Sequence, residues 1–246
     1  MPQAPVADQL TLLTVQDLDT KVDQARHRLA SLPVRQELAE LTARLASLEE
    51  SRVEAATAVT DVRREVTKAE DDVATVRARA DRDNQRMLSG AGLASKELQA
   101  LQSELEVLAK RQGALEEIEL EAMQRLEDAE AEAARVAAEL DQVGAQVADA
   151  QARLDDEAAT IEAEIVSLSA GRANAAAGLD EALLALYEKL RAAQGGTGAA
   201  ALKHGACQGC HMSLNPGDLA RIEAAPADQV VRCEECGRIL VRGATS

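Results

Sequence analysis

The chain has 246 residues, no phenylalanine or tryptophan, one tyrosine and a formal net charge of −16 at pH 7. Aromatic side chains supply much of the buried area of ordinary cores, so this composition excludes a large compact domain of the usual kind. The acidic charge repels phosphate backbones and anionic lipids, which disfavours nonspecific binding to nucleic acids or membranes.

No apolar run approaches the ~20 residues that a membrane-spanning helix needs. The first residues, MPQAPVADQL, lack the basic start and the apolar stretch of a secretory signal peptide. We therefore expect a cytoplasmic protein without membrane contact, in which cysteine thiols stay reduced.

Apolar residues recur every three or four positions in two long stripes, one from Leu38 to Ala80 and one from Leu98 to Leu168. A sustained period of 3.5 residues is typical of a left-handed coiled coil. The turn-forming sequence SGAG separates the stripes, and so short a connection makes the flanking helices antiparallel neighbours. Pro33 breaks an earlier, shorter stripe. The expected helices are about 8–32, 34–87, 95–169 and 178–193, with a turn at about 88–94.

The last of these helices carries the single tyrosine, Tyr187. We expect this helix to pack near the N-terminal segment, with Tyr187 at the edge of the core rather than in a functional site. The following QGGTG, residues 194–198, has the composition of a flexible linker. We therefore place a domain boundary here, between a coiled-coil hairpin at 1–194 and a second domain at 195–246, and expect the two to fold independently.

The four cysteines form two Cys-x-x-Cys pairs, Cys207 with Cys210 and Cys233 with Cys236. Each such turn places two thiolates on one side of a knuckle, and two knuckles complete the tetrahedral shell of a structural Zn2+. A segment of about 50 residues usually needs a metal or disulfides to fold. Short strands are expected at AALK, VVR and ILVR, with a brief helix at NPGDLARIEAA between the pairs. The predicted fold is mainly α, a long antiparallel coiled-coil hairpin with a small C-terminal zinc ribbon.

Other uses of these cysteines fit the sequence less well. A redox dithiol uses one Cys-x-x-Cys near a βαβ pattern, and a catalytic zinc keeps an open coordination position. His204 and His211 flank the first pair, but four cysteines already close the shell, so both are expected at the surface. The sequence has no phosphate-binding loop, nucleophile elbow or His-Glu-x-x-His helix. We predict no catalytic residues and no enzyme activity.

Three segments resemble a bacterial family of coiled-coil-hairpin proteins that end in a four-cysteine zinc ribbon. They are SKELQALQSELEVL after the hairpin turn, CQGCHMSLNP, and CEECGRILV at the end. The resemblance spans nearly the whole chain and implies that the four cysteines are zinc ligands. The family includes an epsilonproteobacterial flagellar regulator that is reported to bind a messenger RNA and a sigma factor. It therefore implies a regulatory role with an RNA or a protein partner.

Two kinds of partner remain open from the sequence. Residues 195–246 carry five basic and five acidic side chains, and they have no aromatic residue on which a base could stack. We therefore expect a non-enzymatic adaptor or scaffold that binds protein partners, with the transcription machinery as one candidate. The alternative is an RNA- or DNA-binding regulator that uses the basic residues of the ribbon. The oligomeric state is left open. The candidate contact residues are Lys203, Arg221, Arg232, Arg238 and Arg242.

Overall fold

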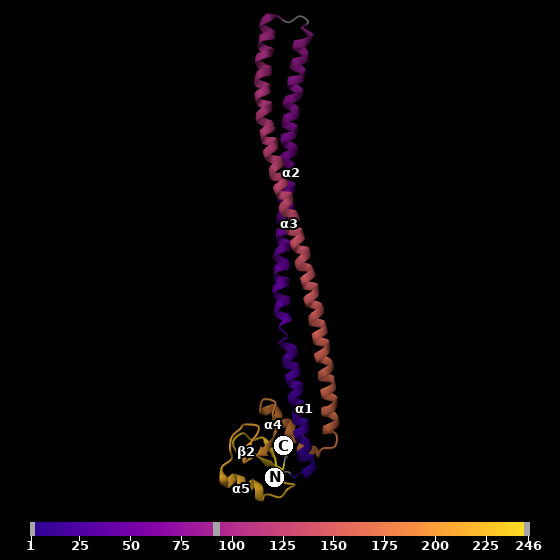
Figure 1. Ribbon diagram of the computed structural model, residues 1–246, viewed down its shortest axis with the longest axis vertical. Helices are drawn as coiled ribbons and strands as arrows, with labels where there is room; N and C mark the ends of the chain where they lie inside the picture. The colour runs from indigo at the N-terminus through magenta and orange to yellow at the C-terminus, as the bar shows by residue number, and fades with distance from the viewer. Residues whose placement is uncertain (1–2, 91–93, 244–246) are drawn as a thin grey trace. The chain divides into compact units, whose positions relative to one another are not determined.

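The computed structural model describes residues 3–90 and 94–243, so the centre of the expected turn at 88–94 lies outside the described residues. It confirms the predicted fold class, a long helical hairpin with a small ribbon that contains short strands (Figure 1). Contacts divide the chain into two compact units, residues 37–151 and residues 1–36 with 152–246. The helices are α1 (Val6–Ala30), α2 (Val34–Ser89), α3 (Ser95–Ala176), α4 (Glu181–Ala193) and α5 (Pro216–Ala224).

The unit at 37–151 is the hairpin formed by α2 and α3. Buried valines of α2 and buried leucines, valines and alanines of α3 line the seam between the two helices. Ion pairs flank this seam, and their partners run in opposite directions along the chain, as antiparallel helices require. They are Arg44 with Glu139 (2.5 Å), Arg63 with Glu130 (2.7 Å) and Arg77 with Glu116 (3.1 Å). Because these pairs are exposed, the apolar seam stabilises the hairpin more than they do.

The other unit packs α1, the end of α3 and α4 against a four-stranded sheet. Its strands are β1 (Ala199–Lys203), β2 (Ala206–Cys207), β3 (Val231–Arg232) and β4 (Ile239–Val241). Their order in the sheet is β2-β1-β4-β3, with β1 and β4 parallel and both outer pairs antiparallel. The N-terminal segment also joins the ribbon, since the backbone N–H of Ala4 donates to the carbonyl of Asp228 (2.8 Å). The boundary between residues 194 and 195 stays a prediction, because the contact units instead divide within α2 and α3.

The small sheet has an apolar core on each of its faces. Successive side chains of a strand point to opposite sides. Ile239 and Val241 of β4 therefore join a core with α1 and α4, whereas Leu240 between them joins a core with α5 and two of the cysteines. All three side chains are fully buried. The sequence predicts that the last helix packs near the N-terminal segment, and this shared core confirms it. The sheet thus connects α1 and α4 on one face to α5 and the cysteines on the other.

The segment at 194–198 is held in place by the helices, contrary to the expectation of a flexible linker. The side-chain oxygen of Gln16 in α1 accepts from the backbone N–H groups of Gly198 (2.7 Å) and Ala199 (3.3 Å). A Cβ atom on Gly198 would lie 2.7 Å from the carbonyl oxygen of Tyr187. Glycine is therefore required here for close packing against α4, and flexibility is not its role.

Tyr187 lies in the centre of the core rather than at its edge, where the sequence analysis placed it. Its side chain is fully buried, and its hydroxyl donates to a carboxylate oxygen of Asp19 (2.7 Å). Burial, with the negative charge of Asp19, raises the pKa of Tyr187 above its ordinary value. Arg172 of α3 and Arg191 of α4 also approach Asp19, at 3.3 and 3.5 Å. This network ties three helices together.

Burial and capping account for where α3 ends and where α4 begins. The sequence analysis expects α3 to end near residue 169, but the helix continues to Ala176, which is buried in the core shared with α4. The following helix begins at Glu181 rather than near 178, because the Asp180 carboxylate caps it by accepting from the N–H of Leu183 (2.9 Å).

We predict that Gln16→Ala lowers the free energy of unfolding of the unit that contains the ribbon by about 1–3 kcal/mol, because two buried N–H groups lose their acceptor. The matched control is Gln24→Ala on an exposed position of the same helix, which should change stability by less than about 0.5 kcal/mol. Urea unfolding followed by the fluorescence of Tyr187, the single aromatic residue, measures both. Equal stability of the two variants would contradict the conclusion that Gln16 holds the segment at 194–198 in place.

Candidate metal centre

The two Cys-x-x-Cys pairs sit at the ends of short strands and face each other. Cys207 ends β2, and Cys210 follows it in the next turn; Cys233 follows β3, and Cys236 lies before β4. All four Sγ atoms lie within 4.8 Å of one another. The Sγ atoms of Cys207 and Cys236 are 3.9 Å apart, and those of Cys210 and Cys233 are 4.0 Å apart. A tetrahedral zinc with bonds of ~2.3 Å requires sulfur atoms separated by ~3.8 Å, so these residues fit Zn2+.

Backbone geometry holds each knuckle in this shape. The N–H of His211 donates to the carbonyl of Cys207, and the N–H of Gly237 donates to the carbonyl of Cys233, both at 2.8 Å. Gly237 has a φ of 70°, in the left-handed region that glycine tolerates best. A Cβ on Gly209 would lie 2.9 Å from the Cβ of Ala200, so the first knuckle also needs a glycine. The sequence analysis had not identified that contact with β1.

The thiols differ in their surroundings. Burial raises the pKa of Cys207, and it raises the pKa of Cys233 to about 12. Burial also acts to raise the pKa of Cys236, but hydrogen bonds from Arg238 and the neighbouring cysteines outweigh it and lower that pKa to about 7. Zinc binds the thiolate form, so metal binding must displace protons from the buried thiols.

The two histidines next to the first knuckle do not join the site. His204 and His211 are exposed, as predicted, and both have positive φ angles, of 50° and 59°. Within residues 3–90 and 94–243, the four cysteines form the one group of three or more histidine, cysteine or acidic side chains spaced for a metal. The shell therefore has four sulfur ligands, which is the arrangement of a structural site.

The arginines predicted as partner contacts make internal hydrogen bonds. Arg242 donates to five backbone carbonyls, those of Ile222, Ala225, Pro226, Ala227 and Gln229. Arg238 donates to the carbonyls of Thr197 (2.9 Å) and Gln194 (3.0 Å), which holds the linker against the second knuckle. These structural roles escape sequence reasoning, because each arginine reaches backbone that is distant in the chain.

The remaining candidates also lie on different parts of the ribbon. Arg232 donates to the carbonyl of Gly237 (2.7 Å), and Arg221 pairs with Asp218 and Glu234, both at 2.7 Å. Lys203, at the end of β1, is half-buried. Contact of any of these five residues with a partner stays a prediction.

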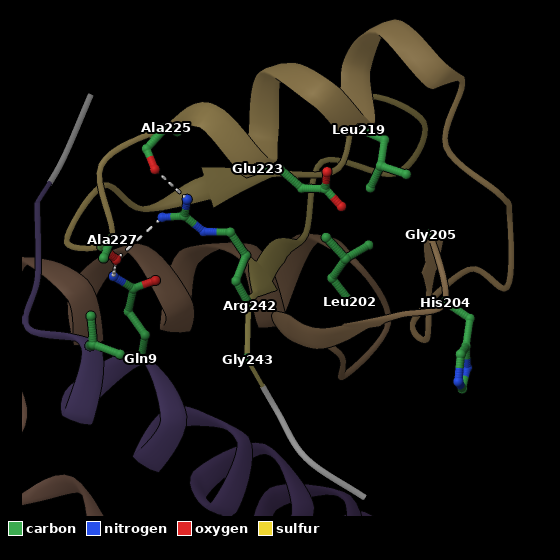
Figure 2. A pocket seen from close by; sticks show the side chains of 11 residues that line it. Gln9, Leu202, His204, Gly205, Leu219, Glu223, Ala225, Ala227, Arg242 and Gly243 are labelled. Atoms are coloured by element: carbon green, nitrogen blue, oxygen red, sulfur yellow. Dashed lines mark hydrogen bonds between the residues drawn. The ribbon is translucent and has the colours of Figure 1, made fainter.

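A hollow of about 580 Å³ lies between the start of α1, strand β1 and α5. Figure 2 shows Arg242 between Gln9 and Glu223, with Leu202 and Leu219 on the other side of the carboxylate. The guanidinium of Arg242 is turned toward the carbonyls of Ala225 and Ala227, away from the apolar side chains (Figure 2). The sequence analysis did not find this hollow, because its walls come from three separate segments. Its wall residues include Val6, Gln9, Leu202, Leu219, Glu223 and Arg242.

None of the helices in the described part of the chain is long and apolar enough to cross a lipid bilayer.

Comparison with known families and structures agrees with both parts of the chain. A model of the CT398-like coiled coil hairpin domain matches residues 15–195, and a model of the C4-type zinc ribbon domain matches residues 206–240. The resemblance stated from the sequence is thereby confirmed, and the cofactor is Zn2+.

Curated relatives and solved structures cover almost the whole chain. Uncharacterized proteins of two Mycobacterium tuberculosis strains, CDC 1551 / Oshkosh and H37Rv, are each 37% identical over 240 residues, which is 98% of this chain and 97% of theirs. A structure from Mycobacterium smegmatis is 34% identical, with a TM-score of 0.83 over 98% of this chain and 100% of that one. CT398 from Chlamydia trachomatis is 20% identical, with a TM-score of 0.66 over 96% and 98% of the two chains, and shows the fold alone.

We predict that the zinc affinity of the folded protein falls steeply with decreasing pH. Above pH 7, Cys207 and Cys233 each give up a proton on binding, so the affinity should change at least about 100-fold per pH unit. Below pH 7, Cys236 is also protonated in the metal-free protein, and the dependence should steepen by about a further tenfold per unit. Competition with a chromophoric chelator between about pH 6 and about pH 8 measures this. An affinity independent of pH would contradict the conclusion that Cys207 and Cys233 are buried thiols that lose protons when zinc binds.

Proposed function

Because this chain belongs to the family of CT398-like coiled-coil hairpin proteins with a C4-type zinc ribbon, we propose that it is a non-enzymatic adaptor that binds protein partners. The hairpin offers a long helical surface, and the ribbon offers a second contact region. Zinc has a structural role here, because four sulfur ligands leave no position for a substrate or a reactive water.

The main support for a protein partner is that arginines of the ribbon already bond to backbone carbonyls or carboxylates of the same chain. Nucleic-acid binding requires cations that are free to approach phosphates. Arg238 and Arg242 are instead directed to backbone carbonyls, and Arg221 is paired with two carboxylates. The donors of these three arginines are therefore already engaged within the chain, and this favours a partner that contacts other groups of the ribbon.

The hollow beside α5 is suited to a protein segment. Val6, Leu202 and Leu219 give it apolar walls. Glu223 is exposed at its side, and among the described residues no ion pair or side-chain hydrogen bond involves its carboxylate. A partner segment with an apolar side chain next to a lysine or arginine would fill the hollow and pair with this carboxylate.

The proposed compartment is the cytosol, where the four thiols remain reduced and available to zinc. A component of the transcription machinery remains the candidate partner, as the family resemblance implies. Nucleic-acid binding through the basic residues of the ribbon is the alternative, and Arg221 and Arg242 could take part in it only by leaving the acceptors that they have here.

The test is capture of partners by three forms of the intact, zinc-loaded protein at about 50 mM salt, where phosphate contacts are strongest. The forms are the wild type, Glu223→Lys in the hollow, and Glu162→Lys as a control with the same charge change on an exposed position of α3. We expect a protein that is retained by the wild type and the control but is lost with Glu223→Lys.

Protein and nucleic acid in the bound fraction are both identified. Equal retention by all three forms would overturn the role of the hollow. Retention of RNA or DNA, with a steep log–log dependence on salt, would overturn the adaptor proposal in favour of the alternative.

A further inference from the structure

Arg238 lies between the zinc ligands and the segment that joins α4 to β1. It follows Cys236 by two residues, and it is half-buried. Its Nε donates to the carbonyl of Thr197 (2.9 Å), and its Nη2 donates to the carbonyl of Gln194 (3.0 Å). Because the guanidinium is planar and its donors have a fixed arrangement, these two bonds set both its position and its orientation.

The same side chain contacts both knuckles of the metal centre. The backbone N–H and the side chain of Arg238 both donate hydrogen bonds to the sulfur of Cys236. The stem of the side chain lies over the first knuckle, where its Cδ is 2.9 Å from the place that a Cβ on Gly209 would occupy. A larger residue at Gly209 would collide with it. Arg238 therefore touches the two knuckles and the segment at 194–198 together.

The charge of the zinc centre favours a cation at this position. Four thiolates outweigh the charge of one Zn2+, so the occupied centre is negative. Glu234 and Glu235 lie between the cysteines of the second knuckle and add further negative charge. Two other arginines beside this knuckle bond to oxygen, since Arg232 donates to a backbone carbonyl and Arg221 pairs with Glu234. Arg238, by contrast, donates to the sulfur of a ligand.

The segment that Arg238 holds is also held by the helices. Gln16 of α1 donates from its Nε2 to the carbonyl of Gly196 (3.0 Å), and its Oε1 accepts from the N–H of Gly198 (2.7 Å). Gln194, at the start of the segment, is the residue that ends α4. The segment thus connects the zinc centre to the helices, with Arg238 bonded to it on one side and Gln16 on the other.

We propose that Arg238 is a positioning residue of the zinc centre, which holds the thiolate of Cys236 in place for the metal and connects it to the segment at 194–198. A hydrogen-bond partner of a metal ligand fixes the orientation of that ligand, and losing the partner commonly lowers metal affinity about 10- to 100-fold. Because Gln16 holds the same segment, α1 influences how long zinc is retained. This inference does not depend on the adaptor role.

The first test is the rate of zinc release by the intact, zinc-loaded protein in excess chelator. Arg238→Gln should release zinc about 10- to 100-fold faster than the wild type. Arg238→Lys keeps the charge but lacks the fixed pair of donors, so its rate should lie between the two, and it gives the comparison if Arg238→Gln does not retain zinc. The control Arg221→Gln removes the same charge from exposed ion pairs beside the same knuckle and should stay within about twofold of the wild type. Wild-type rates for both Arg238 variants would overturn the proposal.

A second measurement separates the bond to sulfur from a general effect on the fold. Cobalt(II) can replace zinc in a tetrahedral thiolate site, and its thiolate-to-metal charge-transfer absorption reports on the sulfur atoms. A hydrogen bond stabilises the electrons of a thiolate, so Arg238→Gln should move this absorption to longer wavelength. Arg221→Gln should leave it at the wild-type position. An unchanged absorption in cobalt-loaded Arg238→Gln would overturn the role of Arg238 in holding Cys236.

The connection to α1 is tested by combining Arg238→Lys with Gln16→Ala. Gln16→Ala alone should release zinc faster than the wild type, whereas Gln24→Ala, on an exposed position of the same helix, should not. Because Gln16 and Arg238 hold the same segment, the double variant should release zinc more slowly than the product of the two separate rate increases predicts. Rate increases that simply multiply, or a wild-type rate for Gln16→Ala, would overturn the connection between α1 and the zinc centre.

Discussion

The contact between the ribbon's small sheet and the helices α1 and α4 is the interaction on which this molecule depends. Ile239 and Val241 belong to a core with Tyr187 and Leu12, while Leu240 between them belongs to a core with Cys207 and Cys233. One strand of three residues therefore has the helical core on one side and the zinc ligands on the other. Neither core is large enough to be stable without the sheet that they share.

This arrangement explains how the C-terminal ribbon of a chain with a single aromatic residue can fold. The hairpin needs only a heptad pattern of small and medium apolar side chains, which the composition supplies. The ribbon cannot be built in that way, so it relies on zinc and on α1 and α4. The single tyrosine lies in the core between the small sheet and the helices α1 and α4, with its hydroxyl bonded to Asp19 and its carbonyl against Gly198.

Features with a local sequence signal could be predicted, and those created by distant contacts could not. The zinc ligands follow from the spacing of Cys207, Cys210, Cys233 and Cys236, and the hairpin follows from its periodicity. The role of Gln16 depends on Gly198, which is distant in the sequence, so no local pattern predicts that role. Composition was misleading at Gly198, because a glycine needed for close packing looks the same in sequence as one needed for flexibility. The internal bonds of Arg242 were hidden for the same reason as those of Gln16.

The rate of zinc release tests the shared core most directly, because a weakened core lets the ribbon open more often and so frees the metal faster. Leu12→Ala removes a fully buried side chain from α1 in the helical core, away from the metal, and Val76→Ala removes a buried one from the hairpin seam as a control. With excess chelator, the account predicts that Leu12→Ala releases zinc at least about tenfold faster than the wild type, while Val76→Ala releases it at the wild-type rate. Equal rates for all three proteins would show that the ribbon folds independently of the helices and would contradict the account.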